Sequence, residues 1–285
     1  MTQIVCLHTI PALPARQRPG GGNATKIDAF AHILPPAYAE RLESITSGAG
    51  VSERILGYRP WIREDPALTD LDARWRTMSQ LGALGAQLYT NVSGAPLDER
   101  RFGAIFDTVI RRDGVLWIHP TRSRIWADYP SEKRSEYGIW WSLGWPYETS
   151  ACMVRLVYSG CFDRYPGLRL ITHHAGAMVP HFSGRLASPL EDPDRAAIYA
   201  RLKADPMDYF RRFYADTAMF GASHAVRCAV DFFGPDHVLF GTDMPLGGPT
   251  VIADTIADVE SLGLPDADAD AIFAGNARRV LRIPA

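Results

Sequence analysis

Histidines and aspartates stand at the ends of short apolar segments, and these residue types bind divalent cations or move protons. His32, His119, the pair His173 and His174, and Asp243 all occupy such places. Imidazole nitrogens and carboxylate oxygens bind borderline and hard divalent ions at about 2.0 to 2.2 Å, and a catalytic site leaves one position open for water or substrate. His32, His174 and Asp243 are therefore candidate metal ligands.

Each histidine also has a structural interpretation, which stays open at this point. His32 precedes two prolines, where a histidine can be hydrogen-bonded near a helix start. Neighbouring residues of a strand point to opposite faces, so only one of His173 and His174 can face the inside of a barrel. His119 precedes Pro120, which restricts it to extended backbone and favours a fixed, inward-facing imidazole. Its alternative is a buried histidine satisfied by a neighbour's carbonyl.

Asp243 follows an apolar strand and precedes a proline that ends regular structure. Asp often caps a following helix, but no helical pattern begins until about Thr250. Next to a metal, its carboxylate could ligate the ion, take a proton from water or hold the substrate. Trp145 and Glu148 start a helix and are candidate substrate contacts. The alternative for Trp145 is packing in the core or an interface. The alternative for Glu148, which we expect in the first turn of this helix, is a favourable interaction of its charge with the helix dipole.

The elements that must position these residues follow an α/β pattern. Apolar runs rich in β-branched and aromatic residues alternate with helical stretches, which is typical of βα units and a parallel sheet. The clearest helical pattern covers residues 98–112. Active sites of parallel barrels gather at the carboxyl ends of the strands, where the polar residues stand. The predicted strands are 27–33, 85–90, 115–119, 168–173, 213–217 and 238–241.

Length and composition predict one barrel domain, over residues 26–285, after a flexible extension of residues 1–25 without a secretory signal. The net charge of −2 and the scattered basic residues argue against a nucleic-acid partner and favour a small-molecule substrate. No apolar run approaches the ~18 residues of a membrane span. The four cysteines form no CxxC pair, which predicts reduced thiols and a cytoplasmic protein.

Five ordered segments resemble the motifs of the amidohydrolase-related family, and the likeness runs from residue 26 to residue 285. The segments are 26–36, 116–120, 170–185, 213–217 and 239–245. The best-known members are aminocarboxymuconate semialdehyde decarboxylase and γ-resorcylate decarboxylase. The resemblance implies a metal-dependent (β/α)₈ barrel that removes carboxylate from unsaturated or aromatic acids, although some members are hydrolases or hydratases.

The resemblance also implies roles for single residues. His32 matches the second histidine of a His-x-His motif, while His174 and Asp243 match ligands on later strands. His119 matches a histidine near the metal and the substrate, and we place His173 among the substrate contacts. In two positions the chain departs from the family: Phe30 replaces the first histidine of His-x-His, and Phe220 replaces a histidine that acts as the catalytic acid/base.

A third departure is length. Residues 81–89 resemble the fourth strand of the family but follow the predicted helix 70–80 almost at once. Either weak strands lie before this helix, around residues 54–58, or the barrel is incomplete. Our hypothesis is that the second and third βα units are missing, which would expose strand edges and favour a homodimer.

Three functions follow from these observations. The leading one is a metal-dependent decarboxylase of an aromatic or unsaturated cyclic carboxylic acid. In this reaction Asp243 or His119 would transfer the proton that replaces carbon dioxide. The second is a hydrolase of an ester, lactone or amide, and the third is a non-catalytic binding or subunit homologue. Mixed imidazole and carboxylate ligands suit zinc, manganese or iron.

Overall fold

The computed structural model describes residues 26–29, 85–92, 94–188, 193–244 and 246–283. For residues 8–10 and 193–195 only the backbone is described. His32, Phe30 and the segments predicted as helix 70–80 and weak strand 54–58 lie outside these residues. The hypothesis of two missing βα units therefore stays a prediction.

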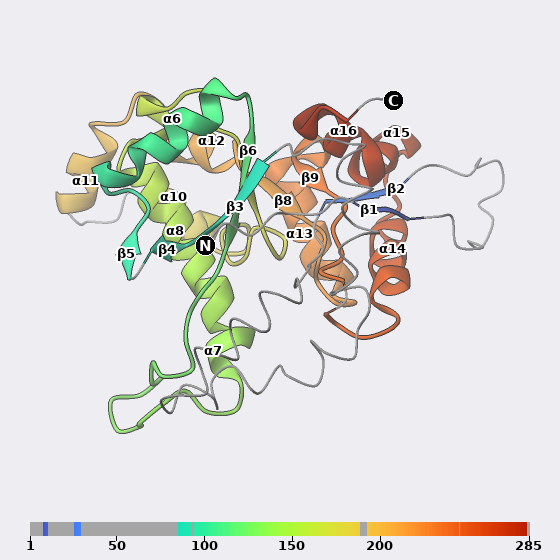
Figure 1. The fold of residues 1–285 in the computed structure, drawn as a ribbon, viewed down its shortest axis with the longest axis horizontal. Helices are drawn as coiled ribbons and strands as arrows, with labels where there is room; N and C mark the ends of the chain where they lie inside the picture. The colour runs from blue at the N-terminus through green and yellow to red at the C-terminus, as the bar shows by residue number, and fades with distance from the viewer. Residues whose placement is uncertain are drawn as a thin grey trace, which may run out of the picture.

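A parallel sheet forms the centre of the described structure (Figure 1). Its five strands are hydrogen-bonded in sequence order, with Tyr89 opposite His119 and Asp216 opposite Leu239. All their carboxyl ends therefore lie at one edge, which we call the carboxyl edge. The strands are β3 (Gly85–Tyr89), β6 (Val115–His119), β7 (Leu170–Thr172), β8 (Tyr214–Asp216) and β9 (Val238–Leu239).

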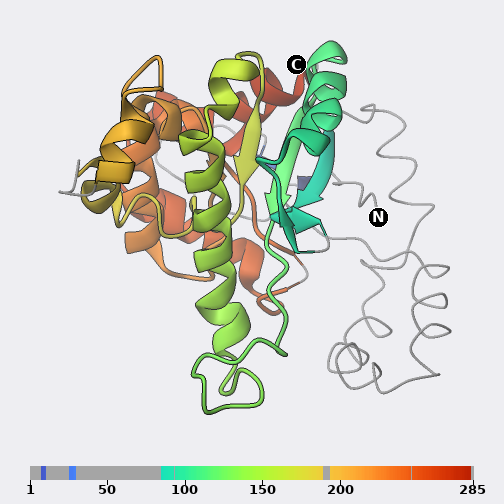
Figure 2. The same cartoon turned by 90° about the vertical axis from the view of Figure 1, so that its left-hand side faces the viewer.

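Helices connect the strands and cover the sheet (Figures 1 and 2). The connections contain η1 (Arg100–Phe102) and α6 (Gly103–Arg111); α7 (Ile139–Ser142), α8 (Gly144–Tyr158) and α9 (Cys161–Arg164); α10 (Ser183–Ala187), α11 (Pro193–Tyr199) and α12 (Pro206–Phe210); and α13 (Ser223–Phe233) with η2 (Pro235–His237). After β9 come α14 (Val251–Ser261), α15 (Asp266–Asp270), the π-helical turn η3 (Ala271–Gly275) and α16 (Asn276–Leu281). None of the helices in the described ranges is long and apolar enough to cross a membrane.

The helix predicted at residues 98–112 is confirmed as η1 and α6, and it buries Phe102 and Phe106. Short antiparallel pairs complete the set of strands. The pair β4 (Asn91–Val92) and β5 (Ala95–Pro96) follows β3, and β1 (His8–Ile10) pairs with β2 (Lys26–Asp28). Part of the predicted extension of residues 1–25 thus lies against the first predicted strand.

The first and last predicted strands lie side by side. The N–H of Ala29 donates to the carbonyl of Phe240 at 2.8 Å, and the carboxylate of Asp28 accepts the N–H and the hydroxyl of Thr242. From β6, the indole of Trp117 donates to the carbonyl of Ala29 at 3.1 Å. The sheet must therefore curve, because β6 and the segment beside β9 meet across its concave side, as in a barrel.

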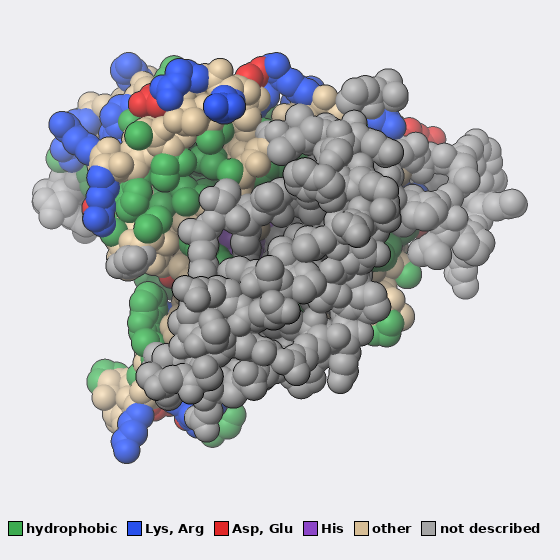
Figure 3. All heavy atoms as spheres, in the orientation of Figure 1, with side chains coloured by type: hydrophobic (Ala, Val, Ile, Leu, Met, Phe, Trp, Pro, Cys, Tyr) green, Lys and Arg blue, Asp and Glu red, His purple; other side chains and the backbone are tan. Residues whose placement is uncertain are grey.

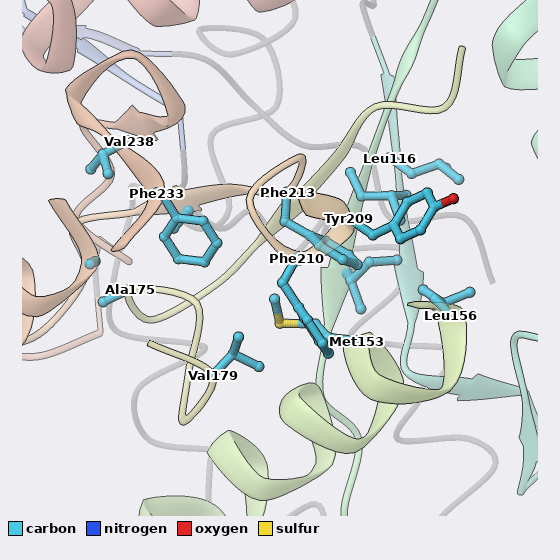
Figure 4. Close-up of a cluster of buried hydrophobic side chains, with 14 of the residues drawn as sticks. Leu116, Met153, Leu156, Ala175, Val179, Tyr209, Phe210, Phe213, Phe233 and Val238 are labelled. Carbon is cyan, nitrogen blue, oxygen red and sulfur yellow. The ribbon is translucent and has the colours of Figure 1, made fainter. Parts of the chain in front are cut away.

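Alternate residues of each strand enter two different clusters, as the period of two requires. Leu116 and Leu170 pack outward against Met153 and Leu156 of α8 and Phe210 of α12 (Figure 4). The inner cluster instead contains Val115, Trp117, Ile171, Tyr214 and Leu239, with Ile27 and Ala29. His119, His173 and Asp216 continue the inner alternation, so the sequence places their side chains on the concave side.

Candidate active site

Four polar side chains gather at the carboxyl edge and are almost wholly removed from solvent. His119 ends β6, His173 follows β7, Asp216 ends β8, and Asp243 follows β9. Their exposed fractions are 9%, 0%, 0% and 4%, respectively. Figure 3 shows a small area of histidine side chain near the middle of the face that it draws. His119, His173 and Asp243 stand at strand ends, as the sequence predicted, and Asp216 joins them.

The carboxylate of Asp216 joins the ends of β7 and β8. Its Oδ2 lies 2.9 Å from Nδ1 of His173, while its Oδ1 accepts the N–H of His174 at 2.8 Å and that of Ala218 at 3.0 Å. Burial raises the pKa of Asp216 to about 6, although the nearby His174 and these N–H groups act in the opposite direction. Asp216 is not among the site residues predicted from the sequence. Its only signal was a carboxylate at the end of an apolar strand.

His174 leaves the strand in a left-handed turn, with φ of 56° at His174 and 57° at Ala175. Its Nδ1 lies 2.9 Å from the carbonyl oxygen of Ala218. A carbonyl only accepts, so Nδ1 carries the proton and the lone pair of the ring is on Nε2. Metal-binding histidines commonly show this pattern, because the carbonyl fixes both the tautomer and the ring direction.

His119 is held in the same way. Its Nδ1 lies 2.6 Å from the carbonyl oxygen of Pro120, which agrees with the alternative of a buried histidine satisfied by a carbonyl and leaves the lone pair on Nε2. Rings surround it, with centroid distances of 5.9 Å to Tyr89, 5.5 Å to Trp145 and 5.4 Å to His173. This imidazole therefore sits in a largely apolar wall with little freedom to turn.

Glu148 hydrogen-bonds to the segments that follow β3 and β6, beside His119. Its Oε2 accepts the N–H of Thr121 at 2.5 Å, and its Oε1 accepts the amide of Asn91 at 2.9 Å. The expected place in the first turn is wrong, because α8 begins at Gly144 and the first turn contains no acidic residue. Favourable interaction with the helix dipole fades beyond that turn, so hydrogen bonds account for this carboxylate. Trp145 donates its indole N–H to the carbonyl of Arg122 at 3.0 Å.

The helix-capping interpretation of Asp243 is also wrong. The next helix, α14, begins at Val251 with Thr250 as its N-cap. Asp243 itself has a φ of 61°, and left-handed backbone at a non-glycine residue is often found at functional sites. Phe220, with a φ of 52°, lies between His174 and Asp243 along the chain and places its ring 5.9 Å from that of His174.

His174 and Asp243 are the two predicted cation ligands that the described residues include. His174 offers the Nε2 lone pair, and Asp243 offers a carboxylate two strands away, at roughly 10 Å between the strand axes. Within the described ranges, no group of three or more His, Cys, Asp or Glu side chains is placed to hold a metal ion. A complete shell therefore needs a further residue, and His32, the predicted one, lies outside those ranges.

A curved parallel sheet with imidazoles and carboxylates at its carboxyl edge is the arrangement of α/β-barrel proteins. The chain belongs to the amidohydrolase family, whose model matches residues 23–283. This confirms the predicted resemblance and the α/β-barrel class.

Known proteins resemble the chain over most of its length. The 2-amino-3-carboxymuconate-6-semialdehyde decarboxylase of Dictyostelium discoideum is 28% identical over 60% of this chain and 45% of its own length. The γ-resorcylate decarboxylase of Polaromonas sp. is 29% identical over 81% of this chain and 71% of its own. A crystal structure of dihydroxybenzoic acid decarboxylase from Polaromonas sp., with bound manganese and the inhibitor 2-nitroresorcinol, is 26% identical and covers 76% of this chain and 66% of that one, with a TM-score of 0.56. The chain thus spans about half of the first relative's length and about two thirds of the solved structure's.

Proposed function

We propose that the protein is a metal-dependent decarboxylase of an aromatic or unsaturated cyclic carboxylic acid. The observation that carries the proposal is the fixed tautomer of His174, whose Nε2 lone pair stands at the same edge of the sheet as Asp243. The named activities of the relatives and the manganese in the dihydroxybenzoic acid decarboxylase structure support the same reaction class.

His32, His174 and Asp243 would hold the cation. When bound, it supplies positive charge against the substrate carboxylate and the carbanion-like transition state. Tyr89 and Trp145 line the site with aromatic surface, which suits a flat ring.

The chain must also deliver the proton that replaces carbon dioxide. Phe220 has no ionisable group, so His119 is our candidate donor: with Nδ1 bound to the Pro120 carbonyl, Nε2 would take up a proton from solvent and pass it to the substrate carbon. The nearly complete burial of His119 removes competing water from this step.

Isotope labelling separates this function from the two alternatives. Protein loaded with manganese is incubated in ¹⁸O-water with γ-resorcylate and related acids. Carbon dioxide release without solvent oxygen in the organic product is the expected result. A hydrolase would incorporate ¹⁸O into its product, which would overturn the proposal.

Metal content tests the ligand set directly. His174→Ala and Asp243→Ala should each lower the bound manganese per chain, because each removes a donor. Manganese content equal to that of the wild-type protein in both variants, together with no turnover, would favour the non-catalytic homologue.

We also propose a cytoplasmic homodimer. Cys152, Cys161 and Cys228, the cysteines in the described residues, form no disulfide, as reduced thiols in a cytoplasm would. The predicted loss of the second and third βα units would leave a strand edge open, and an open edge favours pairing with a second copy. Light scattering at micromolar concentration should give twice the chain mass of 31.5 kDa; a monomer would contradict the proposal.

A further inference from the structure

The buried carboxylate of Asp216 contacts two histidines, the ring of His173 and the main-chain N–H of His174. Both of its oxygens are used: Oδ1 accepts main-chain N–H groups from His174, Ala175 and Ala218, and Oδ2 faces Nδ1 of His173. The side chains of Asp216 and His173 are wholly buried, at 0% exposure. A carboxylate with this many partners acts on the geometry of the turn and of the ring together.

The main-chain contacts fix which oxygen is which. Three N–H groups point at Oδ1, at 2.8, 3.0 and 3.4 Å. An N–H can only donate, so an acceptor must stand at this position. The other oxygen is consequently the one that meets the imidazole of His173.

The contact at Oδ2 then sets the tautomer of His173. A carboxylate oxygen accepts the Nδ1–H of the ring, which puts the lone pair on Nε2. In the sheet, β7 lies between β8, which carries Asp216, and β6, which carries His119. The ring of His173 packs edge-to-face against that of His119, with 5.4 Å between the two centroids and 63° between the ring planes.

We propose that Asp216 is a positioning residue, which holds the ring of His173 in one tautomer and orientation and thereby holds the ring of His119 that packs against it. Asp216 also anchors the turn from which His174 projects. The proposal rests on the proposed function for its effect on rate, whereas the tautomer is a property of the protein alone. In this role His173 acts through the position of His119.

Asp216→Asn separates the two effects of the carboxylate. The three N–H groups keep the amide oxygen at the place of Oδ1, so the amide NH₂ takes the place of Oδ2. It donates to Nδ1 of His173, and the ring must move its proton to Nε2. The turn of His174 keeps its anchors, whereas the tautomer of His173 is inverted.

Long-range ¹H–¹⁵N spectra of protein labelled with ¹⁵N-histidine report the tautomer, and a His173→Gln variant assigns the signal. The wild-type protein should show His173 with the proton on Nδ1, and Asp216→Asn should show it on Nε2. In the variant we expect kcat to fall roughly 10- to 100-fold, with KM within about threefold and manganese content unchanged.

Asp163→Asn is the matched control. Its carboxylate accepts the hydroxyl of Tyr209 and the N–H of Lys203, on α9 before β7 and away from the carboxyl edge. This variant should melt at a lower temperature but keep kcat and the His173 signal.

Two results would overturn the proposal: a wild-type His173 that carries its proton on Nε2, or an Asp216→Asn variant whose tautomer inverts while kcat is unchanged. The wild-type spectrum decides the first even if the variant fails to fold. Should the wild-type protein release carbon dioxide from no acid, the proposed function fails, but the spectra still test the role of Asp216 in setting the tautomer.

Discussion

Glu148→Gln tests whether the wall around His119 depends on one carboxylate. In the wild-type protein the two oxygens of Glu148 accept from two separate donors, the N–H of Thr121 and the amide of Asn91. The amide of Asn91 cannot turn over, because its Oδ1 already accepts the N–H of Gly94 at 2.9 Å. A glutamine has one acceptor oxygen, so its NH₂ must face one of these donors.

The cost follows from the hydrogen bonds. The variant loses one bond to a charged group, worth about 1.5 to 3 kcal/mol, and gains a donor facing a donor. Because Glu148 is half-buried and solvent weakens the loss, we expect about 2 kcal/mol. For a chain of this size, that corresponds to a fall of roughly 4 to 8 °C in melting temperature. Thr121 lies two residues after His119, so kcat should fall roughly tenfold through misplacement of the imidazole.

Calorimetry and steady-state kinetics measure the two effects, with Glu132→Gln as the matched control. The Oε2 of Glu132 accepts the N–H groups of Asp128 and Tyr129 together, so one glutamine oxygen can replace it. This control should melt within about 1 °C of the wild-type protein. If Glu148→Gln is as stable and as active as Glu132→Gln, the carboxylate does not hold the wall and the reasoning is refuted.

Three further predictions concern other parts of the structure. Trp117→Phe removes the bond to the carbonyl of Ala29 and leaves a cavity in the inner cluster, so urea unfolding should show a loss of about 1 to 3 kcal/mol. Burial raises the pKa of Asp258 above its ordinary 3.8, so its ionised form costs stability above that pH. Asp258→Asn should therefore raise the melting temperature at pH 8 and leave it unchanged at pH 3, and an equal shift at both would contradict this. Phe220→Ala should raise KM for aromatic acids roughly tenfold without changing manganese content. The reason is that the exposed ring of Phe220, beside His174, could no longer pack against the ring of the substrate.

The sequence predicted the strands best where both faces are buried. The limits of β6, Val115–His119, agree with the prediction, because a strand covered on both sides is a continuous apolar run bounded by polar residues. The predicted segments 168–173 and 238–241 were too long, since β7 and β9 end at Thr172 and Leu239. Phe240, beyond β9, is apolar and buried, but its N–H donates to the carbonyl of Ile272 instead of a neighbouring strand, and beyond β7 stands the buried polar His173.

The hydrogen bonds of the site were beyond the reach of the sequence. Residues 42 or 43 positions apart meet at Asp216, and no local pattern encodes such a contact. The left-handed turn at His174 was equally hidden, because His and Ala seldom adopt positive φ and nothing in their types requires it. Glu148 was misplaced for a related reason: propensity does not decide whether α8 starts at Gly144 or one turn later.

The replacement of a histidine by Phe220 is compatible with an ordered site because the remaining imidazoles do not depend on that position. His119 and His174 both donate Nδ1–H to main-chain carbonyls, those of Pro120 and Ala218. Main-chain atoms are the same whatever side chain follows, so a substitution at residue 220 leaves both tautomers in place. Among His119, His173 and His174, His173 is the one that takes its tautomer from a side chain, that of Asp216. We therefore expect substitutions at residue 220 to change substrate preference, whereas substitutions at residue 216 change the chemistry.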